Sequence, residues 1–473
     1  MSGLFASLNQ SVRALNAQSR GVETAGRNLA NVNNADYSRQ RVIFGDRGTV
    51  LTPQGAESLG LEAKATQQIR DLLVDRQLAR EIGSTAGLKA QSEALAKAQA
   101  ALGETIDRTQ ETGDSAASGQ GIASAFGEFF NAFKAFAARP TDLGERQNLV
   151  QRSDILAERF RTTDSRLARL QDDIGAQISS DTEEVNSLLD TIANLNGQIG
   201  RLEINAAGSA VDLRDQRQAA VEKLAAKIGA ETRPNATEVG QIDVFVRDGS
   251  GNPVTLVSLA TVANPVAYDG TQLTAGVALT PIALSSGSIN GLFDARDVGI
   301  QTLRDELNTF AGQFASAVNT AYNPTSIAGG DFFTYTAGAA AGTIALAPGL
   351  TPGTLKASNG GAAADNTLAQ AVADLASRNF SIAGGDDIDG TFSQYYSGVV
   401  SGFGRTVSGA AGRLEDQSNI EKLVRQQRQG ISGVSMDEEM ADLLKYQRAF
   451  EASSKVISII DGLLDLVVNR LGR

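Results

Sequence analysis

The chain has 473 residues, 42% of them hydrophobic, and a formal net charge of -12. This size and apolar content predict a folded protein of about two to four domains. The acidic balance argues against a general nucleic-acid role, because phosphate binding needs concentrated Lys and Arg. The chain has no Cys and no His, which excludes thiolate and imidazole chemistry and most zinc sites. It also lacks the apolar run of about 18 residues that a membrane span needs.

The first thirty residues carry one apolar residue in every seven. The series is Met1, Leu8, Leu15, Val22 and Leu29. Such a heptad pattern predicts a helix with a coiled-coil seam. Three Asn and one Asp follow, and they favour turns over helix, so the helix should end near residues 31–34. Residues 37–44 should then be extended.

The same helix carries Arg13, Arg20 and Arg27, which are also seven residues apart. They form either a solvated face, since exposed ion pairs contribute little, or pairs with Glu451, Asp461 or Asp465 across a subunit boundary.

Long helical patterns occupy the middle of the chain on both sides of a β-rich segment. Helices are expected at 66–110, 143–204, 213–228, 303–321, 366–377 and 392–429, with a Gly/Ala-rich stretch at 323–365. Asp212 should be the N-cap of the helix at 213–228, and Gly229 should end it. Apolar residues alternate at Ile242, Val244 and Val246, which predicts strands, so residues 232–292 should form a small β domain.

A second heptad series runs to the end of the chain. Apolar residues recur at Met436, Leu443, Phe450, Ile457, Leu464 and Leu471, with Tyr446, Ile460 and Val467 three residues after members of the series. Ser435 and Glu438 have the S-x-x-E spacing of a capping box at the start of this helix. The two ends share one period, so we expect them to pack together. The narrow apolar surface left over should pack on copies of the same protein or on close relatives.

The expected fold is therefore mainly α and multidomain. Residues 1–35 and 430–473 should form a terminal coiled-coil domain, residues 36–231 and 293–429 a helical rod with minor β structure, and residues 232–292 an inserted β domain. The predicted assembly interface consists of Leu8, Leu15, Val22, Leu29, Leu443, Phe450, Ile457, Leu464 and Leu471.

The sequence contains no convincing motif for catalysis, metal binding or nucleotide binding. Asp386, Asp387 and Asp389 lie near Gly390, but the segment lacks the twelve-residue spacing and final glutamate of a calcium loop, which favours a solvated turn. Neither a G-x-x-x-x-G-K nor a G-x-G-x-x-G motif is present. We therefore predict no catalytic residue, no metal site and no cofactor.

Both ends of the chain resemble a known family. The segment "ANVNNADYSRQ" at 30–40 resembles the A-N-x-x-T-x-G-Y segment of bacterial flagellar axial proteins, and "SGVSMDEEMADLLKYQRAFEASSKVISIIDGLLDLVV" resembles their C-terminal helix. Within that family the chain is similar to hook-associated proteins of the first hook-filament junction type. The matching motif residues are Asn31, Tyr37, Ser38, Arg39 and Gln40. Asn34 and Asp36 replace the threonine and glycine of the family, so the turn would be strained if Asp36 had a positive φ.

The resemblance implies a structural protein and not an enzyme. It implies a ring between hook and filament that acts as a mechanical adaptor, with a flagellar hook or other rod protein as the alternative. The implied partners are further copies of the chain, the hook protein, the second junction protein and a cytoplasmic export chaperone, with no nucleic acid and no membrane insertion. The protein would be extracellular, exported by the flagellar type III apparatus, and the first residues predict no cleaved signal peptide. An intracellular coiled-coil scaffold and an enzyme with a site near residues 330–335 are the alternatives from other classes.

Overall fold

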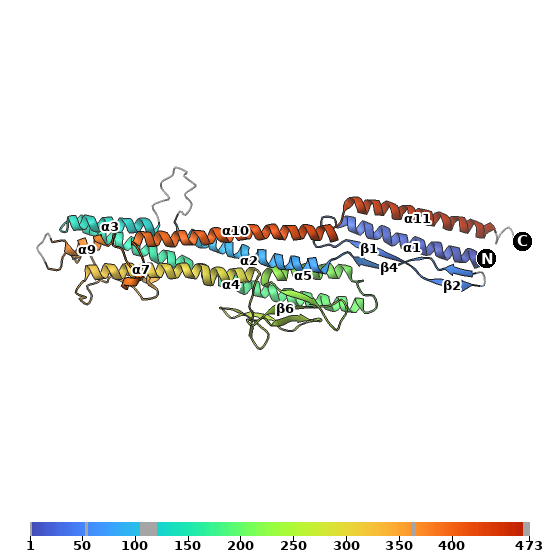
Figure 1. Cartoon of the computed structure of the whole chain (residues 1–473), viewed down its shortest axis with the longest axis horizontal. Coiled ribbons are helices and arrows are strands. Elements are labelled where there is room, and N and C mark those ends of the chain that lie inside the picture. Colours follow the sequence, from blue (N-terminus) through green and yellow to red (C-terminus); the bar gives the residue numbers. More distant parts are fainter. Residues whose placement is uncertain (1, 53–54, 105–120, 361–364, 467–473) are drawn as a thin grey trace. The chain divides into compact units, whose positions relative to one another are not determined.

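The computed structural model describes residues 2–52, 55–104, 121–360 and 365–466 (Figure 1). The helices are α1 (Ser2–Ala30), α2 (Leu72–Leu102), α3 (Ile122–Ala138), α4 (Leu143–Glu203), α5 (Val211–Ile228), α6 (Ser288–Phe293), η1 (Asp294–Ile300), α7 (Gln301–Tyr322), α8 (Ala340–Thr343), α9 (Thr367–Asp374), η2 (Ile382–Gly384), α10 (Phe392–Ser432) and α11 (Met436–Asp465). The strands are β1 (Gln40–Asp46), β2 (Thr49–Thr52), β3 (Gly55–Ser58), β4 (Leu61–Gln68), β5 (Glu231–Pro234), β6 (Ile242–Arg247), β7 (Pro253–Ser258), β8 (Thr261–Val262), β9 (Val266–Tyr268), β10 (Leu273–Ala275), β11 (Thr280–Pro281), β12 (Phe333–Thr334) and β13 (Ala345–Leu346). The prediction of a mainly α fold is confirmed.

The chain divides into two compact units. The first contains Met1–Ala86, Asp181–Gly287 and Gln417–Arg473, and the second contains Gly87–Ser180 and Ser288–Asp416. These units group the residues differently from the three domains expected above, and that three-domain division stays a prediction. No helix among the described residues is long and apolar enough to cross a membrane.

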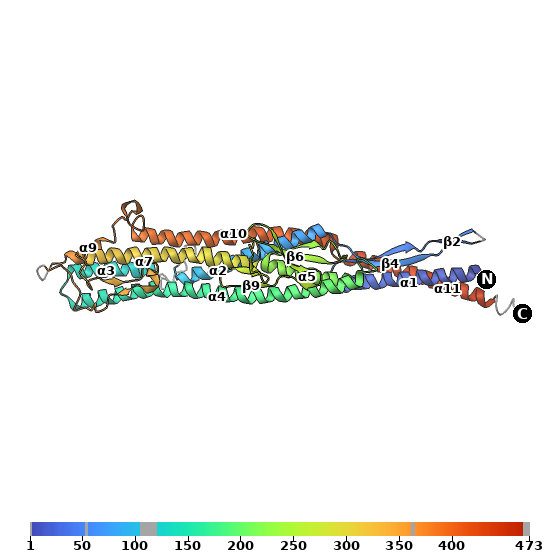
Figure 2. The same ribbon diagram turned by 90° about the horizontal axis from the view of Figure 1, so that it is seen from below.

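In the first unit, the terminal helices α1 and α11 lie side by side, and the start of α1 and the end of α11 lie at the same end of the pair (Figure 2). Helix α1 also packs against a long hairpin in which β1 pairs with β4, from Gln40↔Gln68 to Asp46↔Leu61. Strands β2 and β3 continue the hairpin. The extended segment predicted after α1 is present, but the expectation of helix from residue 66 is wrong, because the returning strand β4 extends to Gln68 and α2 begins at Leu72.

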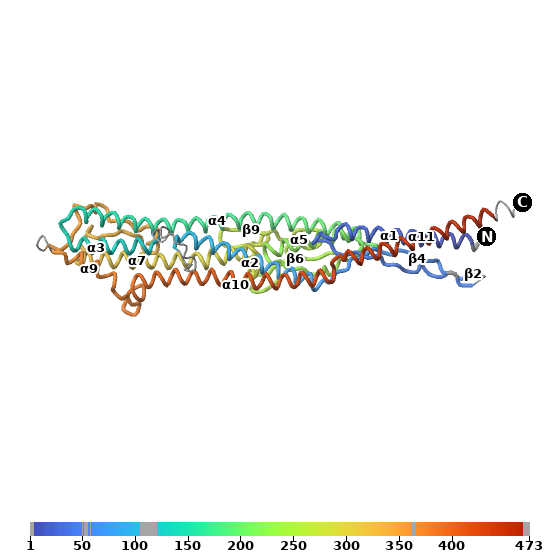
Figure 3. The backbone as a smooth tube through the Cα atoms, turned by 90° about the horizontal axis from the view of Figure 1, so that it is seen from above, coloured from blue at the N-terminus to red at the C-terminus, as the bar shows by residue number. Residues whose placement is uncertain are grey.

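The β-rich segment of this unit forms two small sheets, ordered β5-β6-β7-β8 and β11-β10-β9. Both sheets lie beside α4 (Figure 3). Side-chain amides of α4 fix them: Asn196 donates to the carbonyls of Ile242 and Leu259, and Asn186 exchanges hydrogen bonds with Val266 of β9. Helix α5 ends at Gly229 as predicted, with a left-handed φ of 62°. Asp212 is not its N-cap, because the helix begins at Val211, two residues before the predicted start, and Ala210 holds the N-cap position.

The second unit has an aromatic core. Phe126 and Phe129 of α3 pack against Phe314 of α7 with ring centroids 5.1 Å apart, and Phe392 at the start of α10 lies 5.6 Å from the same ring. Edge and tilted aromatic contacts of this kind stabilise beyond the area they bury. Helix α3 is an element that the sequence patterns missed.

Candidate assembly site

The first and last helices of the first unit form an antiparallel pair. Asn28 of α1 donates to Glu439 near the start of α11, and Gly21, two turns earlier in α1, faces Tyr446, two turns later in α11. A Cβ atom at Gly21 would lie only 2.7 Å from Cδ1 of the Tyr446 ring, so glycine is what allows this close approach. The ring of Phe44 from β1 lies 5.9 Å from the Tyr446 ring on the same seam.

The predicted heptad residues lie along these two helices. Leu8, Leu15, Val22, Leu29, Leu443, Phe450, Ile457 and Leu464 are all partly buried. Met1, Val467 and Leu471 lie outside the described residues. Ile460, predicted beside the seam, is buried at 6% exposure. Their part in assembly between subunits stays a prediction.

Helix α11 carries a second apolar stripe that the heptad pattern of the sequence did not predict. Val456, Ile459, Leu463 and Leu466 are 45 to 57% exposed and recur three and four residues apart, so they lie along one side of the helix. Ser454, Ser458, Asp461 and Asp465 have the same kind of spacing and lie along a polar side. Helix α11 therefore has one apolar side against α1, one polar side, and a second apolar side that faces solvent in the single chain.

Two of the three arginines predicted to line α1, Arg20 and Arg27, have partners within the same chain. Arg27 pairs with Glu23 of its own helix at 2.8 Å, and both side chains are more than half exposed. Arg20 lies 3.5 Å from the carbonyl oxygen of Ala63. For Arg27 this is the solvated-face alternative.

A buried polar network joins the two terminal helices at the place where α1 ends and α11 begins. The side chain of Asn28 donates to Gln40 O at 2.8 Å and to Glu439 Oε2 at 2.9 Å, and its own oxygen accepts from Tyr37 OH at 2.7 Å. Asn28 and Glu439 are almost fully buried, at 1% and 2% exposure. Buried polar groups of this kind are stable only when they are paired, so this network fixes one arrangement of the ends.

Arg39 completes the charge balance of this network. Its Nε donates to Glu439 Oε1 and its Nη1 to Glu438 Oε2, both at 2.6 Å, and its backbone N–H bonds Ser432 O at the end of α10. The predicted capping box is therefore wrong: Ser435 is the N-cap of α11 but its side chain makes no capping bond, and the carboxylate of Glu438 pairs with Arg39 instead of the N-cap.

The remaining motif residues bind the loop to α5. The backbone N–H of Ser38 bonds Asp215 Oδ2 at 3.3 Å, and Gln40 Nε2 donates to Asp212 Oδ1 at 3.0 Å. Arg70 lies 3.6 Å from the Asp215 carboxylate. Burial nevertheless dominates and raises the pKa of Asp215 to about 6, and burial likewise raises the pKa of the neighbouring Asp75.

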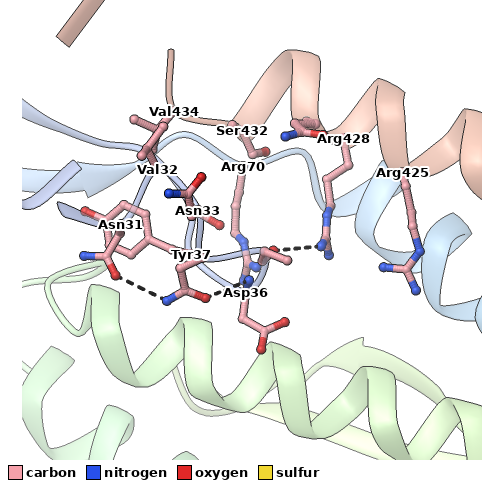
Figure 4. A pocket seen from close by; sticks show the side chains of 15 residues that line it. Asn31, Val32, Asn33, Asp36, Tyr37, Arg70, Arg425, Arg428, Ser432 and Val434 are labelled. Carbon is pink, nitrogen blue, oxygen red and sulfur yellow. Dashed lines mark hydrogen bonds between the residues drawn. The ribbon is translucent and has the colours of Figure 1, made fainter. Parts of the chain in front are cut away.

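The loop itself closes without strain. Asn31 Oδ1 accepts from Asn34, whose own side-chain oxygen accepts from the backbone N–H of Asp36 at 3.1 Å. Asp36 does not have a positive φ, so the departure from glycine costs no left-handed strain. Figure 4 shows the loop facing Arg428, which donates to the Ala35 carbonyl, across a cavity of about 330 Å³ that Ser432 and Val434 also line.

Carboxylates elsewhere do not assemble into a metal site in the part of the chain that the structure describes. In the turn at 384–390, Asp386 and Asp389 accept hydrogen bonds from the backbone N–H groups of Ser381 and Ile382. The described residues form a pair of terminal helices, α1 and α11, that a buried polar network holds together and in which one apolar side of α11 is exposed. An exposed apolar side of this kind is typical of a structural subunit that contacts other proteins.

Comparison with known proteins shows which proteins the chain is similar to. Residues 113–333 match the family model of the "Flagellar hook-associated protein FlgK helical domain", and residues 425–471 match the "Flagellar basal body rod FlgEFG protein C-terminal" model. Flagellar hook-associated protein 1 of Bacillus subtilis is 26% identical, over 100% of this chain and 99% of its own length. The protein of that name from Escherichia coli is 23% identical over 98% of this chain and 99% of its own length.

A solved structure, the flagellar hook junction protein FlgK from Burkholderia pseudomallei, aligns over 55% of this chain and 47% of that chain, with 23% identity and a TM-score of 0.45. The two family models and the full-length relatives show that this chain is similar to flagellar hook-associated protein 1 along its whole length. It is a structural component of the bacterial flagellum.

Proposed function

We propose that the chain forms the junction ring between hook and filament and assembles through its terminal helices. The observation that carries this is the second apolar side of α11, which the pairing with α1 leaves exposed. These four side chains are about half exposed, so covering them contributes about 0.7–1.5 kcal/mol each, half of the value for full burial. Repeated around a ring, that gain favours contact with neighbouring subunits.

In this arrangement the two predicted sets of residues have different roles. Leu8, Leu15, Val22, Leu29, Leu443, Phe450, Ile457 and Leu464 hold α1 and α11 together, with Leu471 continuing the series in sequence. The exposed stripe then contacts the neighbour. Tyr37, Ser38, Arg39 and Gln40 hold the paired ends in one position, as a mechanical adaptor requires.

The partners that the family resemblance implies would contact the same surface. Copies of the chain contact each other within the ring, the hook protein contacts it on one side and the second junction protein on the other. Before export through the flagellar type III apparatus, a cytoplasmic chaperone covers the C-terminal helix, since an exposed apolar stripe promotes aggregation. The ring works by contact alone and carries out no reaction.

A strain that lacks this protein tests the proposal. We expect electron micrographs to show complete hooks without filaments, and the filament subunit released into the medium. Expression of the wild-type chain should restore attached filaments. Normal filaments in the deletion strain would overturn the proposal, and loss of the hook itself would indicate the alternative role of a hook or rod protein.

A further inference from the structure

A groove in the first unit, away from the terminal helices, is lined by arginines. It consists of two adjoining cavities of about 260 and 100 Å³ that share Arg76, Ala79, Thr232 and Arg233. The start of α2, helix α5 and strand β5 form its walls.

Three of the arginines that line the groove are neutralised within the chain. Arg214 pairs with Glu203 at 2.6 Å, Arg233 with Asp243 at 3.3 Å, and Arg70 lies 3.4 Å from Asp75 and 3.6 Å from Asp215. The acidic residues in the lining are also engaged, since Glu231 pairs with Arg247 at 3.0 Å.

Three others, Arg76, Arg80 and Arg217, have no hydrogen-bonded carboxylate among the described residues. Arg76 and Arg80 are exposed and one helical turn apart on α2. Arg217 is only 7% exposed and donates to two neutral oxygens, Asn196 Oδ1 at 2.7 Å and Gly240 O at 2.8 Å. Burial lowers its pKa to about 10, so it stays protonated at neutral pH. Glu203 attracts Arg217 through space, but its carboxylate is hydrogen-bonded to Arg214, so Arg217 has neutral hydrogen-bond partners and an incoming anion would lower the cost of this buried cation further.

The walls of the groove suit a peptide better than a small anion. Leu72 and Leu73 are 60% and 69% exposed at the rim, and Ile242 and Phe245 also line the groove. Strand β5 is at the edge of its sheet, with β6 on one side only, and an edge strand can pair with an extended segment. The net charge of -12 repels a nucleic acid, whose affinity depends on a broad basic surface.

From these contacts we propose that this groove binds an extended acidic segment of a partner protein. Carboxylates of the segment pair with Arg76, Arg80 and Arg217, and its apolar side chains cover Leu72 and Leu73. In a strand, alternate side chains point to opposite sides, so a segment that alternates acidic and apolar residues meets both requirements. This contact is separate from the terminal helices, so its failure leaves the junction proposal standing, and the reverse is also true.

The test measures fluorescence anisotropy of a labelled peptide of alternating leucine and glutamate on the purified full-length chain. We expect saturable binding that weakens when the salt concentration is raised from about 50 to 300 mM. Arg76→Gln/Arg80→Gln should lower the affinity about tenfold, since two exposed ion pairs contribute up to about 1 kcal/mol each. The matched control is Arg166→Gln/Arg169→Gln, which removes two exposed arginines of α4 that also lack a carboxylate partner among the described residues and should bind as wild type.

Arg217→Lys keeps the buried charge without the fork of donors and should bind more weakly than wild type while circular dichroism stays unchanged. Equal affinity for a peptide of leucine and glutamine would overturn the proposal, as would an equal loss in the control variant. Complete displacement by millimolar inorganic phosphate would reduce the groove to a small-anion site. Tighter binding of a single-stranded oligonucleotide would make it a nucleic-acid site.

Discussion

Replacing Gly21 by alanine perturbs the closest approach between α1 and α11. The new methyl carbon would lie 2.7 Å from Cδ1 and 2.8 Å from Cγ of Tyr446. Cγ is at the base of the ring, so a rotation of the ring does not remove the clash and the helices must separate. Gly26 is the matched control, because it lies in the same helix and a Cβ atom there meets nothing within 4 Å.

The magnitudes follow from these two environments. Overpacking costs about 1–3 kcal/mol, whereas alanine in place of glycine inside a helix gains about 0.5–1 kcal/mol. Gly21→Ala should therefore destabilise the pair by about 0.5–2 kcal/mol, and Gly26→Ala should stabilise it by about 0.5–1 kcal/mol. The helix propensity cancels between the two variants, so their difference of about 1–3 kcal/mol isolates the contact with Tyr446.

Hydrogen exchange of the α1 and α11 amides, followed by mass spectrometry on the purified chain, measures this difference. Exchange in Gly21→Ala should be about 5- to 150-fold faster than in Gly26→Ala. In a Tyr446→Ala background the clash is gone, so Gly21→Ala should become neutral or stabilising. If the two alanine variants exchange alike, or if the penalty at Gly21 persists without Tyr446, the antiparallel register described here is incorrect.

Three further predictions concern the buried polar network between α1 and α11, and helix α5. Arg39→Gln should lower the free energy of unfolding by about 3 kcal/mol in urea titrations, because it leaves Glu439 buried without a counter-charge. The double variant Arg39→Gln/Glu439→Gln should recover part of this loss. If it recovers none, Arg39 and Glu439 are not paired. The raised pKa of Asp215 means that the folded state holds a proton that the unfolded state releases, so this stabilising contribution is complete below the ordinary pKa near 3.8 and is lost as the pH rises through about 6. The unfolding free energy should thus rise as the pH falls from 8 to about 5, and Asp215→Asn should flatten that dependence; an unchanged slope would mean that Asp215 is not protonated in this range. Gly208→Ala should lower the free energy of unfolding by about 1 kcal/mol, because Gly208 has a positive φ. Gly229→Ala should lower it further, because Gly229 also has a positive φ and its new Cβ would lie 3.0 Å from the Ser286 carbonyl oxygen. Equal melting temperatures of the two variants would refute this.

The local, repeated features of the fold could be predicted from the sequence. Heptads at both ends indicated two long helices, the Asn-rich turn ended the first, and Gly229 ended α5, since each signal acts within a few residues. The hairpin β1–β4 was harder, because β4 consists mainly of Ala, Glu, Lys and Gln, which are depleted in strands, and Thr66 is its one β-branched residue. Its position is set by packing on α1, which is a tertiary effect.

The site was less predictable than the fold. Asn28 and Glu439 are 411 residues apart in sequence, so no spacing pattern could indicate their bond. The family motif marked Tyr37, Ser38, Arg39 and Gln40 but not their partners on α5 and α11. The exposed stripe of α11 did carry a signal, the three and four spacing of Val456, Ile459 and Leu463, which the stronger heptad series beside it obscured.

The most direct test of assembly through the outer side of α11 compares Ile459→Asp with Ser458→Asp in a strain that lacks the chromosomal copy. Ile459 is 57% exposed in the single chain, so the aspartate should leave the purified monomer as stable as wild type. In an assembled ring the same carboxylate would be buried without a partner, at a cost of several kcal/mol per subunit. If the ring assembles through this side of α11, Ile459→Asp should give hooks without filaments. Ser458→Asp should give normal filament counts, because Ser458 lies on the polar side. Equal filament counts for both variants, with both proteins exported at wild-type levels, would contradict it.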